Sequence, residues 1–550
     1  MTTNPTRAAE PHHRPLKIAV AANFLATPLR AALAIWLQRL GVVSTPELAP
    51  YDSVMQQLLD QDGPVSRADL AIILIRVENW CRHDRAISTE MARRNVDIFL
   101  RSVESAVKRQ MGTVFLIITC PPSPAVRLDD TLAATDERLA VELGTVPNVD
   151  FVGVNDLNLY YPAADYDAYF FRGTGDERDE MHYSELCYAT LSTMIARRIN
   201  AHFAQPRKVI AVDCDNTLWS GVCGERGSVG VTVEGGHLRL QRALLEQRES
   251  GRLLCVCSKN NEADALAVFE NNPQMLLRRE HLSAVRANWL PKVDNLRSLA
   301  GELGVGLDAF VFMDDDPFEC ESVATLCPEV RTVRMECADE TVVERTLLQV
   351  WEFDRTSVTS EDSQRVSYYR QESQRSTVRA ALSLQEFLEQ LDLEVTICAL
   401  QEQGVSRAVQ LTQRVNQFNL NGVRRSAGEI YARLGAATCL MVSASDRFGD
   451  YGVIGLIIYN TSGRALQVET FVLSCRALGR GVEQRLAAHL ADAARASGLS
   501  QIEFEFVPTP KNAPMQQFLA EIGARDDVSA RRVVLIEELT RIKTPQAYRE

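Results

Sequence analysis

Short apolar runs alternate with amphipathic segments of helix length along much of the chain, which predicts buried strands joined by helices. In the first third of the sequence, strands are predicted at 16–22, 70–75, 114–119 and 149–154, with helices at 28–40 and 91–109. Strands that alternate with helices favour a parallel sheet with crossover connections.

The same pattern continues in the middle of the chain, where three predicted strands each end in polar residues. The strands are predicted at 209–212, 253–257 and 309–313, and a helical segment begins near Lys292. In parallel α/β sheets, ligands bind at the carboxyl ends of the strands. One sheet edge should therefore collect the polar side chains Asp213, Asp215, Ser258, Lys292, Asp314 and Asp315.

These side chains suit phosphoryl chemistry. Closely spaced carboxylates are costly to desolvate without a cation, and Mg²⁺ prefers hard oxygen ligands. The hydroxyl of Ser258 and the ammonium of Lys292 suit phosphate oxygens. We predict a Mg²⁺-dependent site in which Asp213 attacks phosphorus and Asp215 moves protons. The alternative is a strand that runs into a polar Asx-type turn, but that explanation must be repeated for three strand ends.

The order of these residues resembles the haloacid dehalogenase (HAD) superfamily. Its DxDxT motif is matched by Asp213, Asp215 and Thr217, its second and third motifs by Ser258 and Lys292, and its acidic fourth motif by Asp314 and Asp315. The resemblance implies that Mg²⁺ is held by Asp213, the backbone carbonyl of Asp215, and Asp314 or Asp315. Thr217, Ser258 and Lys292 are then expected to contact the substrate.

The longer stretches DCDNTLWSGV, VCSKNNEADAL, NWxxKxxN and FMDDDPFECE resemble the FkbH-like branch of this superfamily. That branch makes glyceryl thioesters on carrier proteins for polyketide pathways. The resemblance implies 1,3-bisphosphoglycerate as the substrate and the phosphopantetheine thiol of an acyl carrier protein as the acceptor. Two positions depart from the usual residues of that branch. Arg226 stands where an acidic residue is more common, and Cys320 stands where an arginine is more common.

We predict five parts: a leader at 1–15, an α/β domain at 16–204, a HAD-like Rossmannoid domain at 205–355, a linker at 356–380 and an α+β domain at 381–550. The first domain resembles SGNH hydrolases. Its first strand ends in Asn23 where the nucleophilic serine would stand, although Asp179 and His182 match a D-x-x-H spacing. A base without its nucleophile favours a structural or docking role.

The last domain resembles the GNAT acyltransferase fold. Strands are predicted at 394–399, 439–443, 452–459 and 465–473, and helices at 382–391, 406–413 and 480–495. Arg476, Gly479 and Gly481 fit R-x-x-G-x-G between a strand and a helix. Glycines there let backbone amides approach a pyrophosphate or phosphopantetheine, whereas an ordinary strand-to-helix turn also favours glycine.

A glyceryl thioester on the enzyme would need a thiol, for which Cys475, Cys257 and Cys214 are the candidates. Cys475 is ranked first because it precedes the glycine turn, where a helix N-terminus would activate it. Each cysteine has the alternative of being a small buried filler. The 13 cysteines lack paired CxxC spacing, which is typical of reduced, cytoplasmic proteins.

A length of 550 residues predicts several domains. The net charge of −13 argues against nucleic acid or an anionic membrane as the main partner. No apolar run reaches membrane-spanning length, and the N-terminus lacks a signal-peptide apolar region. Two other functions stay open: a small-molecule phosphatase, and a carrier-protein docking factor with a vestigial HAD site.

Overall fold

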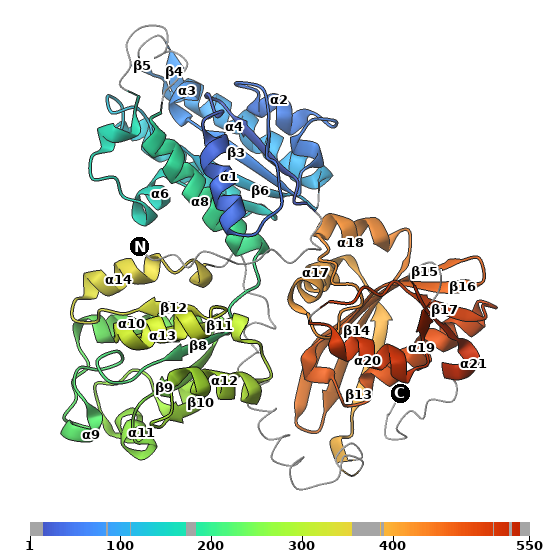
Figure 1. The fold of residues 1–550 in the computed structure, drawn as a ribbon. Helices are drawn as coiled ribbons and strands as arrows, with labels where there is room; N and C mark the ends of the chain where they lie inside the picture. Colours follow the sequence, from blue (N-terminus) through green and yellow to red (C-terminus); the bar gives the residue numbers. More distant parts are fainter. Residues whose placement is uncertain are drawn as a thin grey trace. The chain divides into compact units, whose positions relative to one another are not determined.

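The computed structural model describes residues 15–83, 86–110, 112–171, 183–354, 386, 390–509, 511–526 and 531–539. Their three larger sheets contain five, five and seven strands (Figure 1). Four predicted features lie outside the described residues: the leader except its last residue, the linker, most of the helix predicted at 382–391, and the pair Asp179 and His182. The domain boundaries and the SGNH likeness stay predictions.

The first sheet is parallel and has the strand order β2-β1-β3-β6-β7. The strands are β1 (Ile18–Ala22), β2 (Glu47–Leu48), β3 (Leu70–Ile75), β6 (Val114–Thr119) and β7 (Val149–Val152). Helices α1 (Leu29–Arg39) and α8 (Glu185–Phe203) cover one face, and α4 (Thr89–Arg109) and α5 (Asp130–Leu143) cover the other. The predicted parallel α/β arrangement of this part is confirmed.

Asn23 has a structural role at the end of β1. Its amide nitrogen donates to the Arg76 carbonyl at 3.0 Å, and its amide oxygen accepts from the Arg76 backbone nitrogen at 2.8 Å. The side chain is buried and ties the end of β1 to the residue that follows β3. Because both ends of the amide are engaged with backbone, this position holds two strands together.

The second sheet is parallel and has the strand order β10-β9-β8-β11-β12. The strands are β8 (Val209–Val212), β9 (Leu253–Ser258), β10 (Leu282–Ala287), β11 (Phe310–Asp314) and β12 (Arg331–Arg334). Helices α10 (Gly235–Glu249), α11 (Glu262–Asn271) and α14 (Glu340–Leu348) pack on one face. Helices α12 (Lys292–Leu303) and α13 (Pro317–Leu326) pack on the other.

The third sheet has the order β13-β14-β15-β16-β17-β19-β18, in which β16 and β17 are parallel and the other neighbours antiparallel. Its strands are β13 (Glu394–Ala399), β14 (Thr438–Asp446), β15 (Gly449–Ser462), β16 (Ala465–Leu473), β17 (Gln501–Phe504), β18 (Arg525–Asp526) and β19 (Arg532–Leu535). Helices α19 (Val482–Ala496) and α20 (Ala513–Glu521) share its apolar core. The predicted antiparallel pairing of β15 with β16 is confirmed.

Among the described residues, no helix combines the length and the apolar character that crossing a membrane requires.

Candidate active site

The candidate site lies at the carboxyl edge of the second sheet, over its three central strands. Asp213 directly follows β8, Ser258 is the last residue of β9, and Asp314 is the last residue of β11. β8 lies between β9 and β11, and neighbouring strands are about 4.8 Å apart. Three polar strand ends therefore meet at one place, as the sequence predicts.

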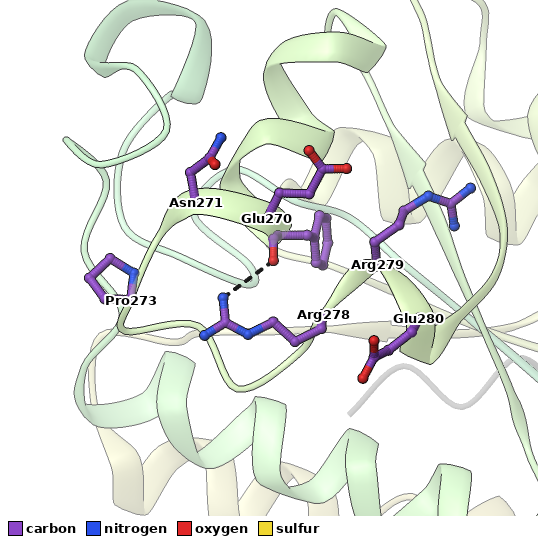
Figure 2. A pocket seen from close by; sticks show the side chains of 7 residues that line it. Glu270, Asn271, Pro273, Arg278, Arg279 and Glu280 are labelled. Atoms are coloured by element: carbon purple, nitrogen blue, oxygen red, sulfur yellow. Dashed lines mark hydrogen bonds between the residues drawn. The ribbon is translucent and has the colours of Figure 1, made fainter.

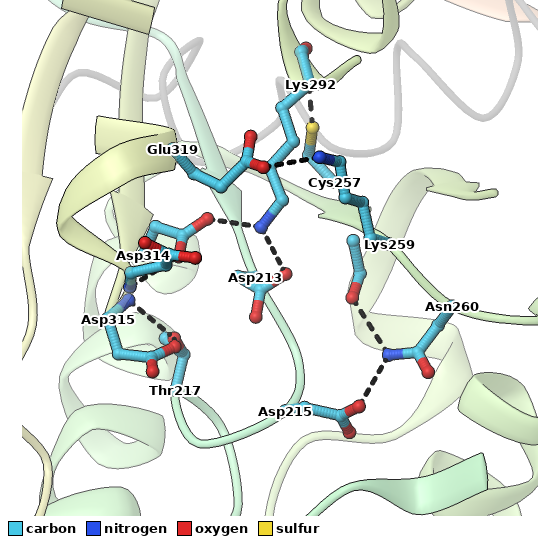
Figure 3. Close-up of polar contacts among 12 residues, drawn as sticks. Asp213, Asp215, Thr217, Cys257, Lys259, Asn260, Lys292, Asp314, Asp315 and Glu319 are labelled. Atoms are coloured by element: carbon cyan, nitrogen blue, oxygen red, sulfur yellow. Dashed lines mark hydrogen bonds and ion pairs between the residues drawn. The ribbon is translucent and has the colours of Figure 1, made fainter. Parts of the chain in front are cut away.

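Lys292 brings two of the carboxylates together. As the first residue of α12, it places its Nζ 2.6 Å from Asp213 Oδ1 and also in contact with Asp314 Oδ2 (Figure 3). All three residues are buried. A buried ammonium between two carboxylates is stabilised only while both partners remain, because a lone buried charge is costly.

The carboxylates crowd each other despite this cation. Burial raises the pKa of Asp314 to about 7, the Asp213 carboxylate adds to the rise, and Lys292 opposes it. Burial also raises the pKa of Asp213, against the pull of Lys292. For Lys292, burial acts to lower the pKa, but the two carboxylates outweigh it and raise it. A divalent cation that binds there would displace the proton that Asp314 carries below about pH 7.

A cation fits the oxygen atoms of this site. Carboxylate oxygens of Asp213, Asp314 and Asp315 lie within 4.8 Å of one another. Thr217 orients Asp315, because its hydroxyl donates to Asp315 Oδ1 at 2.7 Å and accepts from the Asp315 backbone nitrogen at 3.0 Å. Several carboxylate oxygens around one point form the hard donor set that Mg²⁺ prefers.

Asp215 is held apart from this cluster. Its Oδ1 accepts hydrogen bonds from Trp219 Nε1 at 2.8 Å and from the Cys223 backbone nitrogen at 3.1 Å. Its Oδ2 accepts from Asn260 Nδ2 at 3.0 Å, and the same nitrogen lies 3.1 Å from Ser258 Oγ (Figure 3). The carboxyl group of Asp215 is not among the three clustered carboxylates.

Sequence reasoning missed Trp219 and Asn260 as functional residues. Both were part of quoted motif stretches, and Asn260 stands two residues beyond Ser258 at the same strand end. It also missed the ion pair between Lys259 Nζ and Glu319 Oε1, which are 2.5 Å apart beside Lys292 (Figure 3). Position at a polar strand end was the available signal for Lys259 and Asn260. The sequence held no signal for Trp219, because a tryptophan that is buried usually belongs to the hydrophobic core.

The candidate thiols differ in exposure. Cys257 and Cys214 are fully buried, and burial raises the pKa of each thiol. The Cys257 thiol also donates to the Lys292 carbonyl, at 3.8 Å. Cys475 is exposed in a single 3-10 turn, Cys475–Ala477. The long helix α19 begins at Val482, so the expected helix N-terminus does not lie at Cys475.

Two glycines of the turn that follows β16 have a left-handed backbone. Gly479 and Gly481 have φ angles of +70° and +82°, which other residues rarely adopt. The Gly479 amide donates to Glu483 Oε1 at 2.9 Å, and Arg476 Nε donates to Ser474 Oγ at 3.3 Å. A carboxylate of the chain itself therefore occupies one amide that was expected to meet a phosphate.

Arg278, Arg279 and Glu280 are among the residues that line a surface pocket of about 410 Å³ (Figure 2). It sits at the C-terminal end of α11, whereas Asn260 precedes the N-terminal end of that helix. Arg278 closes one side by donating from Nη1 to the carbonyls of Phe269 and Asn272, at 3.4 and 3.1 Å. No predicted site residue lines this pocket, so it is separate from the carboxylate cluster.

The raised pKa of Asp314 predicts how pH changes metal binding. Mg²⁺ requires the ionised carboxylate, so binding should tighten and release fewer protons as pH rises through about 7. The Asp314 carboxyl holds its proton more tightly in the folded state than in the unfolded state, whose pKa is 3.8. It therefore stabilises the metal-free fold fully below pH 3.8, and this stability is lost as pH rises through about 7. Calorimetric Mg²⁺ titrations and thermal melts in chelator, below and above pH 7, test both trends.

Asp314→Asn is the matched control for this prediction, because it keeps the shape but cannot ionise. The variant should show weak binding without the step near pH 7. Equal Mg²⁺ affinity of the natural protein on both sides of pH 7 would contradict the assigned ligand.

No protein-family model and no curated protein sequence matches this chain. Among solved structures, the N-terminal part of the protein BF1531 from Bacteroides fragilis, which contains a phosphatase domain and is complexed with Mg, is similar at a TM-score of 0.55. The identity is 21%, and the match covers 63% of this chain and 95% of that one.

Two acetyltransferase structures match a smaller share. The ribosomal-protein-S18-alanine N-acetyltransferase from Escherichia coli has 14% identity and a TM-score of 0.21, with coverage of 26% of this chain and 94% of its own. The spermidine N-acetyltransferase from Vibrio cholerae, in complex with CoA and spermine, has 16% identity and a TM-score of 0.21, with coverage of 27% and 98%. Over 63% of its length, the chain therefore shares the fold of a protein that contains a phosphatase domain.

Proposed function

We propose that the chain is a Mg²⁺-dependent phosphoryl-transfer enzyme with Asp213 as its nucleophile. The observation that carries this proposal is the group of Asp213, Asp314 and Asp315 oxygens, together with the buried ammonium of Lys292. A metal ion bound there would neutralise the charge that develops on the phosphoryl oxygens. The phosphatase-domain fold and the Mg bound to that related structure support the proposal.

In the first step, an Asp213 carboxylate oxygen bonds to phosphorus while the bond to the leaving oxygen breaks. Lys292 lies 2.6 Å from that carboxylate, so it holds the nucleophile in place and faces the incoming phosphoryl oxygens. The Ser258 hydroxyl, at the neighbouring strand end, can contact the same oxygens. In the second step, a water or another acceptor takes the phosphoryl group, and Asp215 receives the acceptor's proton.

We propose 1,3-bisphosphoglycerate as the substrate and an acyl carrier protein as the partner. The resemblance of the sequence motifs to those of the FkbH-like branch supports this part of the proposal. An enzyme thiol bonds to the acyl carbon while the acyl carbon–oxygen bond to phosphate breaks, and the phosphate takes up the thiol proton. The carrier's phosphopantetheine sulfur then bonds to that carbon, the bond to the enzyme sulfur breaks, and the enzyme sulfur takes up the carrier's thiol proton. Hydrolysis at Asp213 then removes the remaining phosphoryl group, which leaves a glyceryl thioester. The glycine turn with Arg476, Gly479 and Gly481, and a thiol such as Cys475, are proposed to serve this acyl transfer.

The surroundings of the site suit a bulky partner. Trp289 and Phe318 are 76% and 74% exposed, and each lies within four residues of a site residue, Lys292 or Asp314. In the interval between Asp215 and Ser258, the described helices are the four-residue α9 (Cys223–Arg226) and α10. No separate cap domain is present in this interval, all of which the structure describes. A site without such a cap is accessible to an arm carried by another protein.

Intact-mass spectrometry of a holo acyl carrier protein tests the transfer. The carrier is incubated with the full chain, Mg²⁺ and 1,3-bisphosphoglycerate generated in situ. We expect a glyceryl mass gain that disappears in Asp213→Asn, because the 3-phosphate is then retained and any transferred acyl group keeps its extra mass.

Two results would contradict parts of this function. Phosphate release that depends on Asp213, without any gain in carrier mass, would identify a small-molecule phosphatase. A glyceryl mass gain of the same size with the Asp213→Asn variant would indicate a docking factor with a vestigial site. Cys475→Ser then tests the thiol, because a serine cannot form the thioester.

A further inference from the structure

Asp215 is held by three hydrogen-bond donors from its own chain. Trp219 Nε1 and the Cys223 backbone nitrogen reach Oδ1 at 2.8 and 3.1 Å, and Asn260 Nδ2 reaches Oδ2 at 3.0 Å. Trp219 and Cys223 lie in the segment that follows β8, whereas Asn260 follows β9. The carboxylate is therefore fixed from two separate loops.

The two side-chain donors are themselves fixed. Trp219 is fully buried, and its indole packs edge-on against Phe269, with ring centroids 5.6 Å apart and planes at 75°. Asn260 is buried, and its amide oxygen accepts from the Cys223 thiol at 3.4 Å. Neither donor can turn away from Asp215 without losing packing or a second hydrogen bond.

The donors use the carboxylate oxygens unequally. Each oxygen of an ionised carboxylate offers about two lone-pair sites. On Oδ1 both sites are used, by Trp219 and by the Cys223 backbone. On Oδ2, among the residues that the structure describes, the donor is Asn260, which leaves one lone-pair site for a proton.

We propose that Trp219 and Asn260 are positioning residues that make Oδ2 the proton-accepting atom of Asp215. This inference rests on the proposed function. When water attacks the aspartyl phosphate, its oxygen bonds to phosphorus and the bond between phosphorus and the Asp213 oxygen breaks. The electron pair returns to the Asp213 carboxylate, and the proton of the water moves to Asp215 Oδ2.

The arrangement exceeds what a structural turn needs. The Trp219 and Cys223 donors already close the loop that Asp215 begins, since both come from that loop. Asn260 adds a contact from the next strand end, and its nitrogen also lies 3.1 Å from Ser258 Oγ. Ser258 ends β9, the strand beside β8, and Asp213 directly follows β8. One amide thus links the proposed proton acceptor to the strand end beside the nucleophile.

Trp219→Phe tests the inference, because it removes the indole donor and keeps an aromatic ring. The probe is 4-nitrophenyl phosphate, whose leaving group departs without a proton, so loss of the base should slow the second step. We expect kcat to fall at least about tenfold, which is part of the 10²–10⁴-fold acceleration that a general base supplies. KM for 4-nitrophenyl phosphate should be no higher than in the natural protein. Acid-quenched samples should contain a larger steady-state fraction of phosphoenzyme.

Phe269→Leu is the matched control, because it loosens the packing of the indole and keeps its N–H. An equal loss of kcat in both variants, or a Trp219→Phe enzyme with unchanged kcat and phosphoenzyme, would overturn the inference. If neither the natural protein nor Asp215→Asn forms phosphoenzyme, the proposed function is rejected, and with it the proton transfer to Oδ2.

Hydrogen exchange of the indole N–H tests the hydrogen bond without relying on activity. The chain contains 5 tryptophans, and Trp219→Phe identifies the resonance of Trp219. We expect that resonance to exchange at least about tenfold faster in Asp215→Ala than in the natural chain, since the bond no longer protects it. An exchange rate that is the same in both proteins would show that Asp215 is not held by Trp219.

Discussion

Asp213→Asn is expected to lower phosphate release by a factor on the order of 10⁴ or more, as removal of a covalent nucleophile does in other enzymes. The amide nearly matches the carboxylate in shape but does not attack phosphorus, so substrate binding should survive. Discontinuous phosphate assays with 4-nitrophenyl phosphate and Mg²⁺ measure the loss, and mass spectrometry should find no phosphoryl group on the variant.

Asp316→Asn is the control for this prediction. Asp316 belongs to the same acidic run, but its Oδ1 accepts from the Phe318 backbone nitrogen at 2.8 Å and caps α13. Asparagine also caps helices well, so this variant should retain both fold and turnover. Equal losses in the two variants would show that Asp213 contributes charge to the site and is not the nucleophile.

Much of the second sheet was predictable because its central strands are buried on both faces. β8, β9 and β11 are continuous apolar runs, and their ends are marked by Asp213, Ser258 and Asp314. The rule that ligands meet the carboxyl ends of parallel strands then placed these residues together without coordinates. For a strand in the centre of the sheet, a polar residue directly after an apolar run was therefore enough to identify a site residue.

The edge strands were missed for the opposite reason. β10 contains Ser283 and Arg286, and β12 begins and ends in arginine, so neither forms an apolar run. Edge strands carry polar and charged residues that prevent pairing with further strands. They therefore lack the continuous apolar run from which a buried strand is predicted. The short strands β17 to β19 were also missed: each has at most four residues, and both residues of the edge strand β18 are charged.

Contacts that depend on side-chain direction were beyond the sequence. Strand alternation predicts that Asp213 and Asp215 lie on one face, yet β8 ends at Val212 and the backbone then turns, with Asn216 at a φ of +58°. Asp213 consequently meets Lys292, whereas Asp215 meets Trp219 and Asn260. Two carboxylates two residues apart thus have different partners, which spacing alone does not predict.

Lys292→Met should both stop turnover and weaken the fold. The substitution keeps the length of the side chain and removes the ammonium that lies 2.6 Å from Asp213 Oδ1 and contacts Asp314. Two buried carboxylates then face each other without a cation, and losing one member of a buried ionic group costs about 3–5 kcal/mol. A lower melting temperature of the full chain in chelator, compared with the natural protein, measures the effect.

Added Mg²⁺ should return part of that stability, because a divalent ion at Asp213, Asp314 and Asp315 compensates the same two carboxylates. The double variant Lys292→Met with Asp314→Asn is the matched control, since it removes one of the two opposed charges together with the ammonium. It should melt above the single Lys292→Met variant in chelator and gain less from Mg²⁺. If the single variant is as stable as the natural protein in chelator, the carboxylates take up protons at no cost, and the ammonium of Lys292 serves phosphate binding alone.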